Sequence, residues 1–154
     1  MTEHFLYILH KAQQYCSYQE RSLFEVKTKL DEWSTQPSVI EEIIEELRKE
    51  KYLDEEQFAK SFASGKFRVK KWGKNKIIYE LRKKQIPDLY IQIGLSEIDD
   101  DEYLDVLKNL ISKKLSESRE KDPRKRNYKV AYYAISKGYR SGIVWDMIKE
   151  VGDA

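Results

Sequence analysis

Three short aliphatic motifs of one form recur along the chain at intervals of about fifty residues. They are Val26-x-x-x-Leu30, Ile77-x-x-x-Leu81 and Val130-x-x-x-Ala134. Side chains four positions apart lie on the same face of an α-helix, so each motif predicts a helix with one apolar face. A break follows each motif, and a further aliphatic segment then begins. The spacing favours a helical repeat array, and an ordinary helical bundle with coincidental spacing is the competing interpretation.

Helix signals extend along the whole chain, and strand signals are weak. The six glycines and three prolines fall mainly between periodic segments. Helices are expected near residues 3–16, 22–34, 38–50, 54–69, 74–85, 88–96, 100–117, 123–137 and 142–151. We therefore predict an all-α protein of three tandem three-helix repeats that form an elongated, curved helical array. The predicted repeats cover residues 1–52, 53–97 and 98–154.

Several predicted helices begin with a capping signal. The sequences Ser22-x-x-Glu25 and Ser38-x-x-Glu41 have the form of a capping box, in which a hydroxyl and a carboxylate bind free amides of the first turn. Asp54 and Asp122 are suited to the same position before their helices. These signals predict where the helices start.

Positive charge is concentrated in one part of the chain. Residues 66–84 hold nine Lys and Arg and one Glu, whereas the net charge of all 154 residues is only +2. Such a block is a candidate surface for an anionic partner, either phosphate or an acidic protein. A solvated face is the alternative, since cations in a helix's last turn also stabilise the helix dipole. The candidate residues are Arg68, Lys70, Lys71, Lys74, Lys76, Arg82, Lys83 and Lys84.

Two further features are secondary candidates. Trp72 lies within the basic block, where it could pack between two helices or bind a partner. A second basic group, next to Glu120 and Asp122, is as consistent with a binding role as with a linker followed by a helix start. Its members are Arg124, Lys125, Arg126 and Lys129.

Motifs that would indicate catalysis or metal binding are absent from the sequence. Gly73-Lys74-Asn75 lacks the spacing and the Ser or Thr of a phosphate-binding loop. Cys16 is the only cysteine, which excludes an intrachain disulfide and a thiolate metal cluster. No signal peptide or membrane-spanning run is visible. We expect a cytoplasmic binding protein with no enzymatic activity, cofactor, metal or membrane contact.

Motifs in the first two predicted repeats resemble those of the RecX family. The first repeat carries Ser22-x-x-Glu25-Val26-x-x-Lys29-Leu30. The second carries the more specific pattern, in which an aromatic-rich helix is followed by a Gly and basic turn and an aliphatic helix. Gln85 stands where members of the family often have glycine. The signature residues of this pattern are Tyr52, Leu53, Asp54, Phe58, Ala59, Phe62, Trp72, Gly73, Ile77 and Leu81.

The resemblance implies tandem three-helix repeats and a role in regulating the RecA recombinase in recombination, DNA repair and the SOS response. A monomer of this kind would bind the RecA filament and mainly inhibit its ATPase and strand-exchange activity. Weak, non-specific contact with single- or double-stranded DNA is compatible with the basic block. One alternative is a sequence-independent DNA-binding protein that acts without a recombinase. An enzyme such as a nuclease is the other alternative, and the missing ligand motifs argue against it.

The repeat interpretation predicts an anisotropic particle. A compact chain of this length would have a radius of gyration of about 15 Å. Small-angle X-ray scattering should give a clearly larger value, because stacked repeats extend in one direction. A value at the compact figure would leave the helices in place and rule out the extended array.

Overall fold

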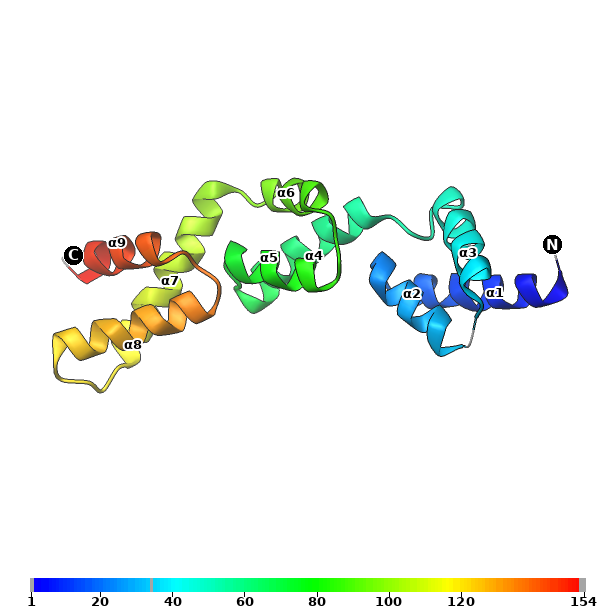
Figure 1. Ribbon diagram of the computed structural model, residues 1–154. Coiled ribbons are helices and arrows are strands. Elements are labelled where there is room, and N and C mark those ends of the chain that lie inside the picture. The colour runs from blue at the N-terminus through cyan, green and yellow to red at the C-terminus, as the bar shows by residue number, and fades with distance from the viewer. Residues whose placement is uncertain (1, 34, 153–154) are drawn as a thin grey trace. The chain divides into compact units, whose positions relative to one another are not determined.

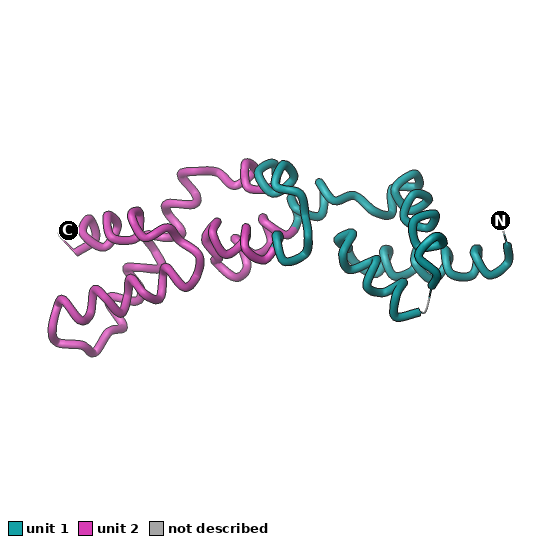
Figure 2. The backbone as a smooth tube through the Cα atoms, viewed as in Figure 1, with its two compact units in different colours: residues 1–61, 81–93 teal, residues 62–80, 94–154 magenta. Residues whose placement is uncertain are grey.

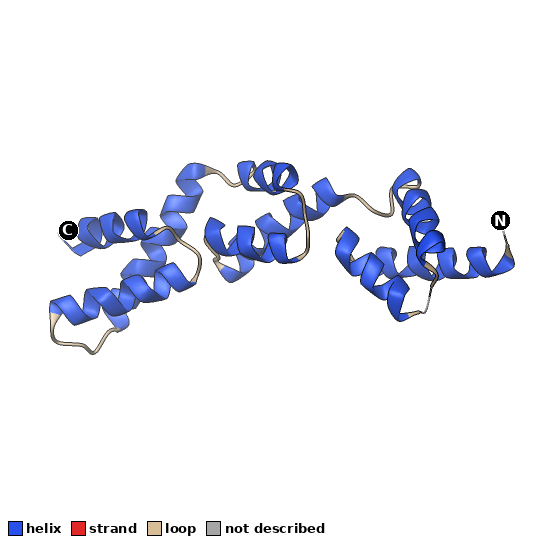
Figure 3. Cartoon of the chain, in the orientation of Figure 1, coloured by secondary structure: helices blue, strands red, loops and turns tan. Residues whose placement is uncertain are grey.

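The computed structural model describes residues 2–33 and 35–152, and its regular secondary structure is entirely helical (Figure 1; Figure 3). Within these residues there are nine α-helices and no strand, which confirms the predicted all-α class. The helices are α1 (Glu3–Tyr18), α2 (Leu23–Glu32), α3 (Pro37–Lys49), α4 (Glu55–Lys70), α5 (Lys74–Lys83), α6 (Asp88–Ser96), α7 (Asp100–Glu117), α8 (Pro123–Ser136) and α9 (Ser141–Gly152).

Three of the predicted caps are present. The hydroxyl of Ser22 accepts a hydrogen bond from the backbone N–H of Glu25 at 3.1 Å. The carboxylate of Asp54 accepts from the N–H of Gln57 at 3.0 Å, and that of Asp122 accepts from the N–H of Arg124 at 2.9 Å. Each bond satisfies an amide that has no partner within its own helix.

The predicted capping box at Ser38 is wrong. Helix α3 begins at Pro37, and its N-cap is Gln36, whose side chain makes no capping bond. The ring of Pro37 fixes φ near the helical value and needs no N–H partner, so it is well suited to the first helical position. Ser38 therefore lies inside the helix, two residues after the capping position.

The three aliphatic motifs end in the same way. The N–H of Thr35 donates to the carbonyl of Leu30 at 3.2 Å, and the N–H of Ile86 donates to that of Leu81 at 3.1 Å. In the third motif the N–H of Tyr139 donates to the carbonyl of Ala134 at 3.2 Å. A backbone hydrogen bond to the carbonyl five residues back closes a helix in a Schellman turn. The structure thus repeats the same local ending after each motif.

The left-handed residue of this turn differs between the second and third motifs. Gly138 has a φ of 109°, and Gln85 has a φ of 60° at the matching position. The left-handed region costs little for glycine and more for a residue with a Cβ. The turn at Gln85 is nevertheless formed, so the glycine common in the family is not required here.

The chain divides into two compact units, which Figure 2 shows in different colours. Unit 1 comprises residues 1–61 and 81–93, and unit 2 comprises residues 62–80 and 94–154. All three boundaries fall inside helices, since α4, α5 and α6 each contribute to both units.

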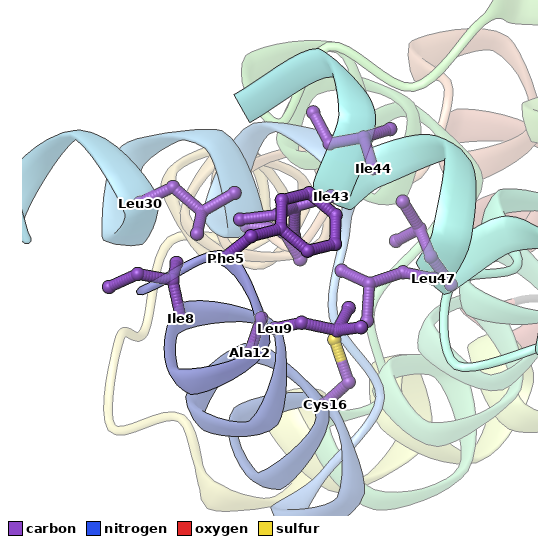
Figure 4. Packing of buried hydrophobic residues seen from close by; sticks show 11 residues of the cluster. Phe5, Ile8, Leu9, Ala12, Cys16, Leu30, Ile43, Ile44 and Leu47 are labelled. Carbon is purple, nitrogen blue, oxygen red and sulfur yellow. The ribbon is translucent and has the colours of Figure 1, made fainter. Parts of the chain in front are cut away.

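The core of unit 1 is formed mainly by α1, α2 and α3 (Figure 4). Ile43, Ile44 and Leu47 lie on one face of α3 and are buried, as their spacing predicts. Leu30 from the first motif is fully buried against them. The full cluster is Phe5, Ile8, Leu9, Ala12, Cys16, Val26, Leu30, Ile43, Ile44, Leu47 and Leu53.

The thiol of Cys16 is part of this core and is expected to be unreactive. Burial raises its pKa to about 11, although the positive charge of Arg21 acts in the opposite direction. Because the thiolate is the reactive form, a disulfide reagent at pH 8 should label the folded protein roughly a hundredfold more slowly than the urea-unfolded chain. The absorbance of the released thiolate measures both rates, and equal rates would contradict the buried position.

The core of unit 2 is built around three aromatic side chains. The rings of Phe67 and Tyr103 are 5.7 Å apart, and those of Tyr103 and Tyr139 are 5.1 Å apart. All three side chains are buried, and Tyr139 is completely so. Aliphatic residues from α5, α7, α8 and α9 complete the core: Ile77, Leu107, Ile111, Val130, Ala131, Ala134, Val144, Met147 and Ile148.

Two loops of unit 2 meet through their glycines. The N–H of Gly73 donates to the carbonyl of Lys137 at 2.8 Å, and the N–H of Asn75 donates to the carbonyl of Gly138 at 3.0 Å. A Cβ placed on Gly73 would lie 2.3 Å from the carbonyl carbon of Gly138. Neither backbone can move aside without breaking these bonds, so the approach requires glycine at position 73.

Replacing Gly73 with Ala should therefore destabilise the protein by about 1–3 kcal/mol, the usual cost of overpacking. Gly65 provides a matched control, because it lies in α4 and a Cβ there would have nothing within 4 Å. Gly65→Ala should stabilise the chain by about 0.5–1 kcal/mol through helix propensity. Urea unfolding followed by circular dichroism measures both changes. Equal stability of Gly73→Ala and the wild type would disprove the close contact.

Candidate binding surface

The predicted basic block begins at the end of α4. Arg68 and Lys70 lie in its last turn, Lys71 follows it directly, and all three side chains are exposed. Lys74 and Lys76, at the start of α5, are half-buried. The cations of this turn therefore differ in how far they are available to a partner.

The backbone of this turn is held by side chains from both loops. The hydroxyl of Tyr139 donates to the carbonyl of Lys71 at 2.9 Å, and Nζ of Lys137 donates to the carbonyl of Lys70 at 2.8 Å. Nζ of Lys71 donates to the carbonyl of Arg68 at 2.9 Å. Carbonyls at the C-terminal end of a helix have no intrahelical partner, so these three donors both satisfy and fix the end of α4.

Trp72 packs within unit 2, which is the first of the two roles that its sequence context suggested. Its side chain is half-buried and packs edge-on against Phe62, with 6.2 Å between the ring centroids. Nζ of Lys76 lies 4.6 Å from the centroid of the Trp72 ring, and Nζ of Lys66 lies 5.0 Å from it. The ring thus stabilises two neighbouring ammonium groups by cation–π contact.

Lys74 makes contacts within unit 2. Its Nζ lies 3.7 Å from a carboxylate oxygen of Asp100 and 4.9 Å from the centroid of the Tyr103 ring. Its backbone N–H donates to the hydroxyl of Tyr103 at 2.9 Å. We infer that this lysine contributes more to the packing of unit 2 than to an exposed surface.

The remaining members of the basic block belong to unit 1. Nζ of Lys84 lies 3.1 Å from Oε1 of Glu25, and both side chains are largely buried. Arg82 pairs with Asp88 at 3.1 Å on the surface, and Lys83 is exposed. The basic block is therefore divided between the two units. The charge of Lys84 is compensated by Glu25 of α2.

The second basic group lies at the start of α8. Arg124 and Lys125 are exposed, and Arg126 is half-buried. Nζ of Lys129 lies 3.0 Å from Oε2 of Glu120. The hydrogen bond from Lys129, together with backbone hydrogen bonds, lowers the pKa of Glu120. This group is thus partly compensated by an acidic side chain of the preceding loop.

A groove of about 340 Å³ in unit 2 contains cations that the sequence did not single out. We call it the lysine groove; Lys71, Lys113, Lys114 and Lys137 lie along it, together with Tyr133. Lys113 and Lys114 are adjacent near the end of α7, and Lys137 directly precedes Gly138. Only the packing of α7 and α8 brings them near Lys71, so sequence spacing could not join them.

Neither a metal centre nor a membrane segment is found in the part of the chain that the structure describes. Nowhere in residues 2–33 and 35–152 do three His, Cys, Asp or Glu side chains gather as a metal site requires. Among the same residues, no helix has both the length and the apolar character needed to cross a bilayer.

This fold and surface define a class, a helical-repeat protein with an exposed basic turn. Three domain models of one family match the chain in order: the first three-helix domain of RecX at residues 9–47, the second at 54–95 and the third at 100–148. The chain belongs to the RecX family.

Relatives of the chain carry the name regulatory protein RecX. The protein from Lactobacillus johnsonii is 37% identical over 103 residues, which are 67% of this chain and 38% of the relative. That from Oceanobacillus iheyensis is 31% identical over 147 residues, 93% of this chain and 54% of the relative. The chain thus spans roughly half the length of these two proteins or less.

Two crystal structures resemble this fold. RecX from Lactobacillus salivarius superposes with a TM-score of 0.88 over 97% of each chain at 23% identity, a likeness of fold alone. A second structure, described as regulatory protein RecX, gives a TM-score of 0.82 at 28% identity, over 92% of this chain and 73% of the other.

The buried hydroxyl that holds the basic turn predicts a pH dependence. Burial raises the pKa of Tyr139, as does the neighbouring Tyr103. The neutral form is therefore favoured in the folded state, and its stabilising effect is complete below about pH 10 and declines as the pH rises further. Tyr139→Phe removes the bond to the Lys71 carbonyl and should cost about 1–2 kcal/mol at pH 8. The difference between the unfolding free energies of Tyr139→Phe and the wild type should become smaller above pH 10.

Tyr132 supplies the control for this experiment, because its side chain is 78% exposed. Tyr132→Phe should leave the urea midpoint unchanged at pH 8. If the difference in unfolding free energy between Tyr139→Phe and the wild type stayed constant from pH 8 to above pH 10, the pKa of the hydroxyl would not change on unfolding.

Proposed function

We propose that this protein regulates a RecA-type recombinase by binding along its filament and suppressing ATP hydrolysis and strand exchange. The observation that carries this proposal is the succession of three RecX domain matches from residue 9 to residue 148. The regulatory name of the relatives supports the same role. Since the proposed partner works on chromosomal DNA, the proposal places the protein in the cytoplasm.

The exposed cations of the basic turn are the proposed contact with the filament. Arg68, Lys70 and Lys71 are exposed, and the carbonyls beside them are fixed by hydrogen bonds. An acidic protein surface or the phosphates of bound DNA would complement them, which speeds encounter and fixes the register of binding. Lys74 and Lys84 have a supporting role in this proposal, because each lies close to a carboxylate of its own unit.

Inhibition of this kind needs no chemical step by the regulator itself. A protein that binds one state of the filament better than another shifts the population toward the favoured state. Several weak contacts on successive repeats increase the overall affinity through effective concentration. We therefore propose a monomeric binding protein with no turnover and no cofactor.

The second candidate function is sequence-independent DNA binding without a recombinase. The exposed charges of Arg68, Lys70 and Lys71 favour it, because phosphate contacts require only accessible cations. DNA affinity would then fall steeply with salt, and the protein would leave the recombinase unaffected at salt concentrations where DNA binding is lost.

The decisive experiment is charge reversal at the end of α4. Arg68→Glu combined with Lys70→Glu should raise the concentration needed for half-inhibition of the recombinase ATPase roughly tenfold, since two favourable charge contacts become repulsive. The assay uses the RecA-type recombinase of the same organism on single-stranded DNA. Circular dichroism and the melting temperature should remain close to wild type, because both side chains are exposed.

A matched control is available at the end of α3. Lys49 and Lys51 are two exposed cations with the same spacing at a helix end, so Lys49→Glu with Lys51→Glu imposes the same change in charge and dipole. This variant should inhibit like the wild type. If the Arg68/Lys70 variant inhibited the recombinase as strongly as the wild type, the contact would lie elsewhere on the protein. If the wild-type protein did not inhibit the recombinase, the proposed function would be wrong.

A further inference from the structure

We propose that the lysine groove of unit 2 binds an acidic peptide segment that carries one apolar side chain. The groove lies along α7, beside the end of α8 and Lys71. Its floor is apolar and its rim is positively charged, and the two together determine which partner fits.

The floor of the groove is apolar. Val106 and Leu110, one turn apart on α7, are half-buried and line the groove. A partner that covers apolar atoms left partly in contact with water lowers the free energy of the complex. A leucine- or phenylalanine-sized side chain is therefore the expected anchor.

The rim of the groove carries four lysines and a single carboxylate, that of Glu117. Neutral groups position three of the ammonium groups. Nζ of Lys71 and that of Lys137 donate to backbone carbonyls, and Nζ of Lys114 lies 4.1 Å from the centroid of the Tyr133 ring. Lys113 lies 4.0 Å from Glu117 in an exposed pair. The rim thus holds positive charge that its carboxylate does not neutralise, and acidic side chains would complement it.

A peptide fits this groove better than a nucleic acid. A base would need the open face of an aromatic ring for stacking, and Lys114 already covers Tyr133. A phosphate backbone would meet the lysines but would have no group for the apolar floor. A segment with acidic residues on both sides of an apolar one satisfies the floor and the rim together.

This inference rests on the proposed function only for the source of the peptide, which would be a segment of the protein partner. A binding assay with a synthetic peptide contains no recombinase. Failure to bind peptide would therefore leave the filament proposal standing, and failure to inhibit the recombinase would leave the groove proposal standing.

The test is fluorescence polarisation with the 154-residue protein and three labelled probes. The first is a peptide of Asp and Glu with one central Phe, the second has Ala in place of that Phe, and the third is an oligothymidylate of equal charge. The first peptide should bind most tightly. Lys113→Gln combined with Lys114→Gln should weaken its binding roughly tenfold, because two charge contacts are lost.

A second double variant keeps the net charge matched. Lys108→Gln with Lys121→Gln removes two exposed cations of unit 2 that lie outside the groove, and it should bind the first peptide like the wild type. Three results would overturn the proposal: equal affinity for the Phe and Ala peptides, tighter binding of the oligothymidylate, or full affinity in the Lys113/Lys114 variant.

Discussion

The backbone contact between Gly73 and Gly138 is the constraint on which unit 2 depends. Two loops approach so closely that a Cβ on Gly73 would lie 2.3 Å from a backbone atom of Gly138. Because the loops are this close, Lys137 and Tyr139 reach the carbonyls at the end of α4. The same hydrogen bonds fix the backbone that carries the exposed cations of the turn. Gly73, which in the sequence is only part of a Gly-Lys pair, therefore determines where the charged surface forms.

Local patterns predicted much of this fold, and long-range contacts explain what they missed. Apolar spacing predicted the helices, because a helix must bury one face whatever its neighbour is. The start of α3 was misplaced by one residue, since the preference of Pro37 for the first helical position outweighed the signal of Ser38. The pairing of Lys84 with Glu25 spans 59 residues, and no local pattern encodes it. The same holds for the lysine groove, whose cations meet only when α7 and α8 pack.

The structure also changes the electrostatic argument about the basic block. Closely spaced like charges repel, so the sequence alone made the block a candidate surface for an anionic partner, with a solvated face as the alternative. Part of the compensation is internal: carbonyls at the end of α4 accept from Lys71 and Lys137, and the Trp72 ring contacts Lys66 and Lys76. The density of charge is consequently weaker support for a partner than the exposure of Arg68 and Lys70, which these interactions leave unchanged.

Fixed cations differ from mobile ones in how well they can bind. A lysine on an open surface loses side-chain entropy when a partner immobilises it, which offsets much of the gain from a surface ion pair. Lys71, Lys114 and Lys137 are already held by carbonyls or by an aromatic ring. Part of this entropy cost is met on folding, so each can contribute more to affinity than an unrestrained lysine. The glycine contact, by bringing the two loops together, thus helps to fix the lysines of the proposed binding surface.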